Sequence, residues 1–194
     1  AHRDAAGVDR RGDVGAQHLG QRHRAVHVEQ ARALLQQAGT GDRLAVVSAH
    51  RNEGRSYLAA NLAVTFAQAG ERTLLIDGDL HNARQHKLFK LDNQAGLSNL
   101  LIGQVQEAVV KFMPGIPGLA VLPSGPLPPN PQELLSRPTF ARILEQSMST
   151  FNVVIVDTPA IEEGIDGTML AHAAGAALAV ARSNLTKTGA FDEM

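Results

Sequence analysis

The sequence predicts an α/β fold with a doubly wound, mainly parallel sheet and helices on both faces. Five short apolar runs have the length and continuity of strands that are buried on both sides. Segments with helical spacing of apolar residues alternate with these runs, as in right-handed βαβ units. With 194 residues, 44% of them hydrophobic, the chain is long enough for one domain with a sizeable core.

The first part of the chain differs from the rest. Residues 1–26 mix Arg, His, Gly and Asp with isolated apolar residues at no regular period. We therefore expect a poorly ordered arm over 1–26 and a folded domain over 27–194. Four of the eight histidines lie between His2 and His27, without the spacing of metal ligands. From Val28 the pattern becomes helical, and Gly39 is a suitable helix end.

The expected strands and helices then follow in a regular order. The strands are expected at Leu44–Ser48, Thr73–Asp77, within Gly118–Gly125, at Asn152–Asp157 and at Ala176–Ser183, and helices at 56–69 and Arg137–Met148. The first, second and fourth of these strands should be neighbours inside the sheet. The Pro-rich stretch Pro123–Pro138 fits either a linker or an ordered surface loop. We favour the loop, because strand and helix patterns resume on both sides of it.

Three polar motifs stand where strands are expected to end. The first, "AHRNEGRS" (Ala49–Ser56), follows a strand and opens a helix, as a phosphate-binding loop G-x-x-x-x-G-K-[ST] does. Gly54 and Ser56 match this pattern, whereas Ala49 and Arg55 replace its first glycine and its lysine. The other two motifs are "DGDL", with Asp77 and Asp79, and "DTPA", with Asp157. Ligands of doubly wound sheets bind beyond the carboxyl ends of the strands, where these motifs should converge.

This combination suits phosphate chemistry. Backbone N–H groups at a helix N-terminus bind phosphate oxygens, and Gly54 allows a close approach. Mg²⁺ prefers a hydroxyl and carboxylates, so Ser56 and Asp157 are the natural ligands and Asp79 can join them. Asp77 is placed to accept a proton from an attacking hydroxyl. For each aspartate taken alone, capping of the next helix is an equally good interpretation.

At this point the chain resembles the bacterial tyrosine kinases of capsule and exopolysaccharide export, which are P-loop relatives of MinD and ParA. The resemblance rests on "LAVVSAHRNEGRSYLAANLAVTFAQAGERTLLIDGDLHNARQHKLFKL", "GLSNLLIGQ", "LAVLPSGPLPPNPQELLSRPTFARILEQ" and "FNVVIVDTPA". It covers roughly residues 29–182 and is strongest for the chain-length-determinant tyrosine kinases of exopolysaccharide biosynthesis. It implies a fold of the P-loop NTPase type.

The resemblance also implies roles for individual residues. ATP would be bound by Ala49, His50, Arg51, Asn52, Glu53, Gly54, Arg55, Ser56 and Tyr57. Asp77 and Arg55 would be catalytic, with Asp77 activating the tyrosine hydroxyl. Mg²⁺ would be held by Ser56, Asp79 and Asp157. Because Arg55 stands where the family has lysine, phosphoryl transfer is expected to be slow or undetectable.

Further implications concern assembly. The family forms rings through an N-terminal Glu-x-x-Arg-x-x-Arg helix, which Glu29 and Arg32 match and Leu35 does not. A membrane-bound polysaccharide export or copolymerase protein is the implied partner. Relatives continue with a further helix and strand, so we expect a fragment or a trimmed fold. The family's C-terminal tyrosine cluster is absent, and Tyr57 is the only tyrosine.

Composition limits the other function classes. A net charge of −1 gives no reason to expect nucleic acid as a partner. No uninterrupted apolar run approaches the ~18 residues of a membrane span. We expect a cytoplasmic protein, and the resemblance leaves open attachment to the inner face of the membrane through a partner or a removed segment. Two functions stay open: a kinase that controls polysaccharide chain length, and a non-catalytic nucleotide-binding or scaffold module. A partitioning ATPase is disfavoured by "PPNPQELL" and by the missing lysine.

Overall fold

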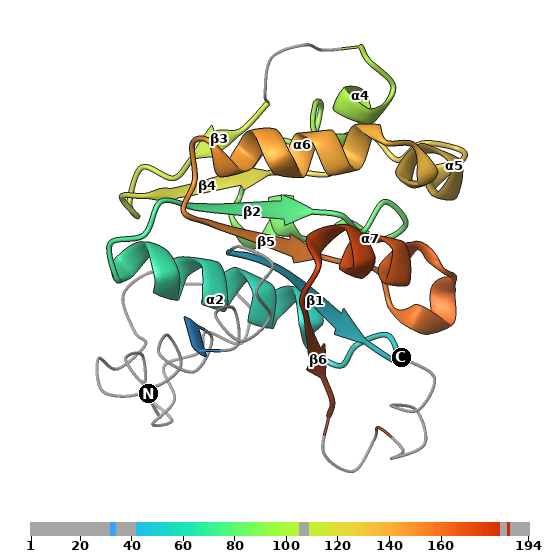
Figure 1. The fold of residues 1–194 in the computed structure, drawn as a ribbon, viewed down its shortest axis with the longest axis horizontal. Coiled ribbons are helices and arrows are strands. Elements are labelled where there is room, and N and C mark those ends of the chain that lie inside the picture. Colours follow the sequence, from blue (N-terminus) through green and yellow to red (C-terminus); the bar gives the residue numbers. More distant parts are fainter. Residues whose placement is uncertain (1–31, 34–41, 105–108, 183–185, 187–194) are drawn as a thin grey trace, which may run out of the picture.

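The computed structural model describes residues 32–33, 42–104, 109–182 and 186. Its centre is a six-stranded sheet in the order β3-β4-β2-β5-β1-β6 (Figure 1). The strands are β1 (Arg43–Ser48), β2 (Thr73–Asp77), β3 (Lys111–Phe112), β4 (Leu119–Leu122), β5 (Val153–Asp157) and β6 (Ala177–Val180). Only β3, the short edge strand, runs antiparallel to its neighbour, and the other pairs are parallel. The predicted neighbours β2, β5 and β1 lie side by side, as expected.

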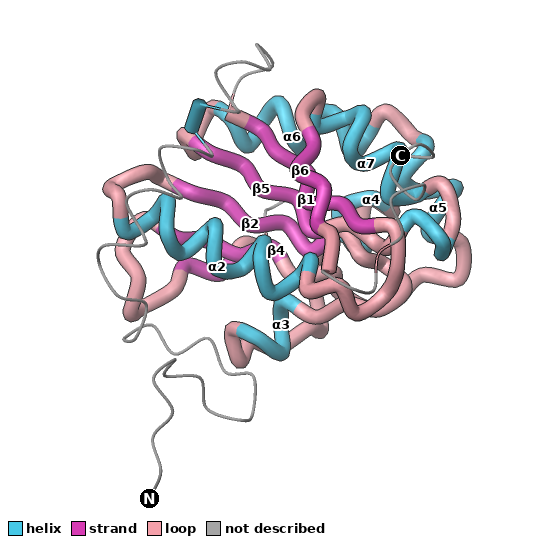
Figure 2. Tube along the Cα trace, turned by 90° about the horizontal axis from the view of Figure 1, so that it is seen from below, coloured by secondary structure: helices cyan, strands magenta, loops and turns pink. Residues whose placement is uncertain are grey.

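Helices cover both faces of this sheet, as Figures 1 and 2 show. Helix α2 (Arg55–Gln68) lies on one face, and α6 (Thr139–Met148) and α7 (Asp166–Ala174) lie on the other. Strand residues alternate between two apolar clusters, so that Val46 and Ile155 pack toward α2 while Val47 and Val156 pack toward α6 and α7. The doubly wound α/β fold predicted from the sequence is therefore confirmed.

Several short elements do not appear among the sequence predictions. They are the strand β3, the helices α3 (Gln85–Leu88), α4 (Leu97–Leu101), α5 (Pro131–Ser136) and α7, and the 3₁₀ helix η1 (Ile161–Glu163). Helix α5 lies inside the Pro-rich stretch, so the prediction of a surface loop is wrong for that part. Pro131 occupies the first helical turn, where its missing N–H costs nothing, and Leu134 and Leu135 are buried.

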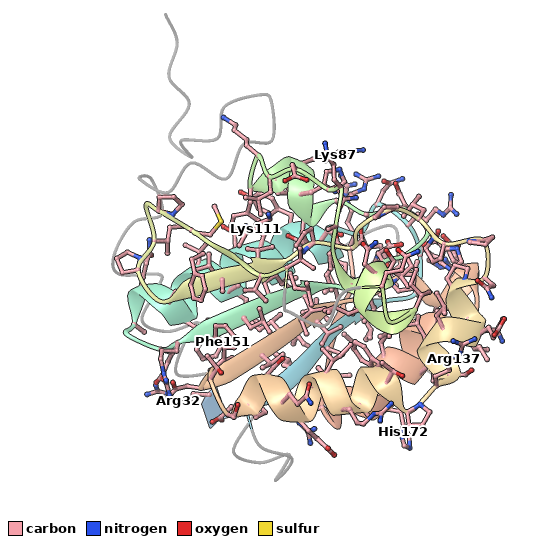
Figure 3. All side chains as sticks on the ribbon, turned by 90° about the horizontal axis from the view of Figure 1, so that it is seen from above. Arg32, Lys87, Lys111, Arg137, Phe151 and His172 are labelled. Atoms are coloured by element: carbon pink, nitrogen blue, oxygen red, sulfur yellow. The ribbon has the colours of Figure 1, made fainter. Side chains whose placement is uncertain are left out.

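Some expectations fall outside the described residues. These are the arm over 1–26, the start of the domain at 27, and the helix residues Glu29 and Leu35. Arg32 is described, and its guanidinium pairs with the carboxylate of Glu71. Figure 3 places Arg32 at the same end of the molecule as Phe151, which precedes β5. In the described ranges, no helix combines the length and the apolar character needed to cross a bilayer.

Candidate functional site

The three sequence motifs meet at the carboxyl ends of the inner strands. Asp77 ends β2 and Asp157 ends β5, and the two are paired in the register of these neighbouring strands. Val46 of β1 pairs with Asp157 on its other side, so the loop that follows β1 starts beside the same carboxylates. The convergence on which the predicted phosphate site depends is present. It follows from the parallel sheet, because each apolar run stops at the same edge.

The loop after β1 turns sharply into α2. Asn52 and Gly54 have positive φ angles of 63° and 93°, and the second favours glycine. The helical hydrogen bonds begin with the N–H of Leu58, which donates to the carbonyl of Gly54 at 2.9 Å. Among the described residues, no side chain caps this helix N-terminus. The N–H groups of its first turn therefore point out of the helix, together with the positive end of the dipole.

A cavity of about 220 Å³ opens beside this helix N-terminus. The segment from Arg51 to Tyr57 lines one side, and Asn82, Arg84 and Leu88 line the other. Eight of the nine predicted nucleotide-binding residues, from His50 to Tyr57, lie in the loop or the first turn of α2, and Ala49 is buried at the loop start. Tyr57 is 41% exposed. The arrangement can hold an anion of phosphate size at the helix terminus.

Arg55 does not extend into solvent. Its residue is 8% exposed, and its guanidinium lies among acceptors from three strand ends. Nη1 donates to the Ser48 hydroxyl at 2.7 Å, and Nη2 donates to Asp79 Oδ2 at 3.2 Å. Nε lies 3.4 Å from Asp157 Oδ1, which is an ion-pair distance without hydrogen-bond geometry. The arginine therefore contacts two of the three predicted metal ligands.

Asp77 is a buried carboxylate with one engaged oxygen. Its Oδ2 accepts the backbone N–H groups of Arg84 and Gln85 at 3.1 and 2.9 Å. Its Oδ1 has no hydrogen-bond partner among the described residues. Burial, together with the nearby charge of Asp157, raises the pKa of Asp77 well above its usual range. A carboxylate with a raised pKa is suited to accept a proton near neutral pH.

Gln85 connects the motifs, and the sequence reasoning did not identify it. Its Nε2 donates to Asp157 Oδ2 at 2.8 Å and to the carbonyl of Ser56 at 2.9 Å. Burial raises the pKa of Asp157 to about 6, and the attraction of the Arg55 guanidinium opposes that rise. Gln85 thus joins the loop–helix junction to the end of β5. Its position on a four-residue helix after the second motif gave no periodic signal.

Asp79 is held by its own turn as well as by Arg55. Its Oδ1 accepts the N–H groups of His81 and Asn82 at 3.1 and 2.8 Å. The ring of His81 contacts Asp166 Oδ2 through Nε2 at 2.6 Å, which ties this turn to α7. Asp79 is 2% exposed. Both of its oxygens are therefore engaged within the chain.

Acidic side chains also fix the outer part of the loop. Glu53 Oε2 accepts the N–H of His50 at 3.0 Å, and Glu162 Oε1 accepts the N–H of Arg51 at 2.7 Å. The Arg51 guanidinium pairs with Glu163 at 2.5 Å. Glu162 and Glu163 follow Asp157 by five and six residues, in the 3₁₀ helix η1. This acidic pair after a strand end was a signal that the sequence reasoning left unused.

The residues fit Mg²⁺ in donor type. Ser56, Asp79 and Asp157 supply a hydroxyl and carboxylate oxygens, which hard cations prefer. Buried oxygens without a hydrogen-bond partner among the described residues include Asp77 Oδ1 and Asp157 Oδ1, so acceptor capacity remains. Within the same ranges, no group of three or more His, Asp or Glu side chains is arranged to hold a metal by itself. Mg²⁺ usually takes one or two carboxylates together with waters and phosphates.

Comparisons with known proteins show which sequences and structures the chain resembles. No family model matches the chain. Tyrosine-protein kinase YwqD of Bacillus subtilis is 38% identical over 142 residues, which are 73% of this chain and 60% of YwqD. Tyrosine-protein kinase ptk of Acinetobacter johnsonii is 42% identical over 129 residues, 66% of this chain and 18% of ptk. The chain therefore spans less than two thirds of the length of these curated relatives.

Solved kinase domains match a larger share of this chain than the two curated relatives do. The kinase domain of VpsO superposes with a TM-score of 0.77 at 31% identity, over 88% of this chain and 85% of that domain. The kinase domain of Escherichia coli Etk gives a TM-score of 0.78 at 32% identity, over 86% and 68%. MinD of Pyrococcus horikoshii, solved with Mg-ADP, shares the fold with a TM-score of 0.61 at 20% identity, over 71% and 56%. The chain belongs to the family of bacterial tyrosine kinases, which have the fold of P-loop ATPases such as MinD.

Proposed function

We propose that the chain binds ATP at Ala49–Ser56 and transfers its terminal phosphate to protein tyrosine, in the control of exopolysaccharide chain length and export. The observation that carries the proposal is the convergence of the loop, Asp77, Asp79 and Asp157 at the N-terminus of α2. The similarity to YwqD and to the VpsO kinase domain supports the reaction class. Protein tyrosine is the proposed acceptor, and the polysaccharide role follows from the resemblance in sequence.

Each part of the proposed reaction has a residue suited to it. The first-turn N–H groups of α2 bind phosphate oxygens, and Arg55 lies in this turn with its guanidinium against Asp79 and Asp157. Ser56, Asp79 and Asp157 would hold Mg²⁺, which neutralises phosphate charge when bound. Asp77 accepts the proton of the tyrosine hydroxyl, and the raised pKa of Asp77 favours that role.

Arg55 makes transfer slow in this proposal. A lysine at this position follows the β- and γ-phosphates as a slim point charge, whereas a guanidinium is planar and makes a fork of hydrogen bonds. Anion binding by backbone N–H groups does not depend on either side chain. Nucleotide binding is thus retained, while the geometry of transfer suffers.

The test compares binding with transfer. ATP affinity is measured by calorimetry, and transfer by labelling a Glu–Tyr copolymer, in a Tyr57→Phe background because Tyr57 is the only tyrosine of the chain. We expect Arg55→Lys to raise the transfer rate about tenfold or more and the affinity by less than about threefold. Asp77→Asn should retain binding and lose transfer. Binding of ATP without transfer in either the wild type or Arg55→Lys would favour the non-catalytic module, and no binding at millimolar Mg-ATP would refute the phosphate site.

Assembly and location are part of the same proposal. We propose a cytoplasmic position at the inner face of the membrane, next to a membrane-bound polysaccharide export protein, and weak self-association through Glu29 and Arg32. A solved chimera, CapA2B2, aligns with the chain at 33% identity. The pairing of Arg32 with Glu71 within the chain competes with contacts to a second copy. Sedimentation of wild type and of Glu29→Ala/Arg32→Ala decides the point, because identical monomers in both would reject the interface.

A further inference from the structure

Arg55 stands out among the buried charges of the described residues. It is the one buried basic side chain there, and the buried acids around it are Asp77, Asp79 and Asp157. Other basic side chains near the loop lie outward: Arg51 is 61% exposed in its side chain, and Arg84 is exposed. The guanidinium is therefore the internal counter-charge of the carboxylate cluster. Without it, three buried carboxylates would face one another.

We propose that Arg55 is a tethered cation that occupies the metal side of the site and competes with Mg²⁺ for Asp79 and Asp157. The consequence for ligand binding rests on the proposed nucleotide site. The contacts of Arg55 with Asp79 and Asp157 exist in the chain without nucleotide. The two carboxylates that a metal would use are those that the guanidinium contacts, at 3.2 and 3.4 Å. Mg²⁺ bound to the same oxygens would lie close to a buried positive charge.

The shape of the guanidinium explains why the arginine holds this position. Nη1, Nη2 and Nε each face a different acceptor, from Ser48, Asp79 and Asp157. Ser48 is fully buried, and its hydroxyl donates to the carbonyl of His50, so its lone pairs are directed by the loop itself. A lysine ammonium is one point charge and cannot span these three acceptors at the same time. Arg55→Lys would leave carboxylate oxygens available to a metal.

Two consequences follow for ligand binding. Mg²⁺ alone finds no free pair of carboxylates while Arg55 remains in place. Nucleotide affinity is largely independent of Mg²⁺, because the protein already neutralises the carboxylates and the phosphates meet backbone N–H groups. In a lysine variant the cluster needs an external cation, so Mg²⁺ and nucleotide should bind cooperatively.

The first experiment uses the metal alone. Thermal unfolding is measured for wild type, Arg55→Ala and the exposed control Arg142→Ala, with 10 mM MgCl₂ and with NaCl of equal ionic strength. We expect Arg55→Ala to lower the Tm by roughly 6–12 °C, because it leaves buried carboxylates unpaired. Mg²⁺ should restore several degrees in Arg55→Ala and should not change wild type or Arg142→Ala. An Arg55→Ala Tm that Mg²⁺ leaves unchanged, or an equal Mg²⁺ gain in wild type, would overturn the proposal.

The second experiment covers the case in which Arg55→Ala does not fold. ADP affinity is measured for wild type and Arg55→Lys in EDTA and in 10 mM MgCl₂. We expect a change of less than about twofold in wild type and a gain of about fivefold or more with Mg²⁺ in Arg55→Lys. Equal Mg²⁺ gains in the two proteins would overturn the inference. If neither protein binds ADP, the proposed nucleotide site fails, and Tm measurements with MgCl₂ on Arg55→Lys and wild type still decide whether Arg55 excludes the metal.

Discussion

Asp77→Asn should make the protein more stable while it removes the proposed proton acceptor. The Asp77 residue is fully buried, and its Oδ1 has no hydrogen-bond partner among the described residues. Asparagine is nearly isosteric, so its oxygen can still accept the N–H groups of Arg84 and Gln85, which now bond to Oδ2. The substitution therefore removes a buried charge and retains the hydrogen bonds of the turn.

The size of the gain follows from the neighbouring strand. Asp77 and Asp157 are register partners, so their backbones lie about 5 Å apart, the spacing of adjacent strands. Two unit charges about 5 Å apart at an effective dielectric constant of about 20 repel by about 3 kcal/mol. Arg55 and proton uptake by the cluster relieve part of this energy. We expect a net gain of roughly 1–2 kcal/mol, or about 2–8 °C in Tm for a chain of this size.

Urea unfolding at pH 7.5 measures this gain, with two control variants. Asp77→Ala removes the acceptor of two N–H groups and should be less stable than wild type by roughly 1–3 kcal/mol. Asp92→Asn changes an exposed aspartate that also accepts a backbone N–H, from Gln94, and should stay within about 0.5 kcal/mol of wild type. If Asp77→Asn is no more stable than wild type, the carboxylate cluster is not under electrostatic strain and the reasoning is refuted.

Three further substitutions test other parts of the fold. Gln85→Leu should weaken ADP binding, measured by calorimetry, and should lower the free energy of unfolding by roughly 1–3 kcal/mol. The reason is that the side-chain amide of Gln85 joins Asp157 to the first turn of α2. An unchanged ADP affinity would show that Gln85 does not position the site. Gly96→Ala should prevent soluble expression, since its Cβ would lie 2.1 Å from the carbonyl oxygen of Pro123, whereas Gly115→Ala has open space and should express normally. Phe140→Ala should cost roughly 3–5 kcal/mol in urea unfolding, because Phe140 is a residue of α6 whose ring is buried in the core on that face of the sheet. A loss below about 1 kcal/mol would contradict the packing described for that face.

The sequence predicted the features that depend on long, continuous patterns. Two inner strands, Thr73–Asp77 and Val153–Asp157, are apolar runs that end in aspartate, and a parallel sheet brings such ends together without further information. The N-terminus of α2 was predicted within one residue, because Gly54 and an apolar period mark it. The fold and the place of the site therefore came from patterns of five or more residues.

Except for the nine-residue helix α7, the missed elements have too few residues for a repeating pattern. Helix α3 has four residues and β3 has two, so each spans about one period and shows no repeat. Helix α5 carried a start signal in Pro131, but the neighbouring prolines favoured a loop. The contacts of Gln85 and Arg55 depend on the tertiary fold. Their common partner, Asp157, follows them in the chain by 72 residues (157 − 85) and 102 residues (157 − 55). Spacing along the chain gives no information about such pairs.

The arrangement of charge around the loop affects how strongly a nucleotide or a metal ion can bind there. Several charged groups that a nucleotide complex would use already have a partner inside the chain, although Asp77 Oδ1 and Asp157 Oδ1 accept no hydrogen bond from the described residues. Arg55 contacts Asp79 and Asp157, while carboxylates of Glu53 and Glu162 accept loop N–H groups. A phosphate or metal ion that uses these same groups must replace the existing contacts, so the net free energy of binding is the difference between two sets of similar interactions. Removing a contact within the chain should therefore alter ligand affinity more than adding a new contact to the ligand. Arg55 is the residue that contacts two of the carboxylates, Asp79 and Asp157.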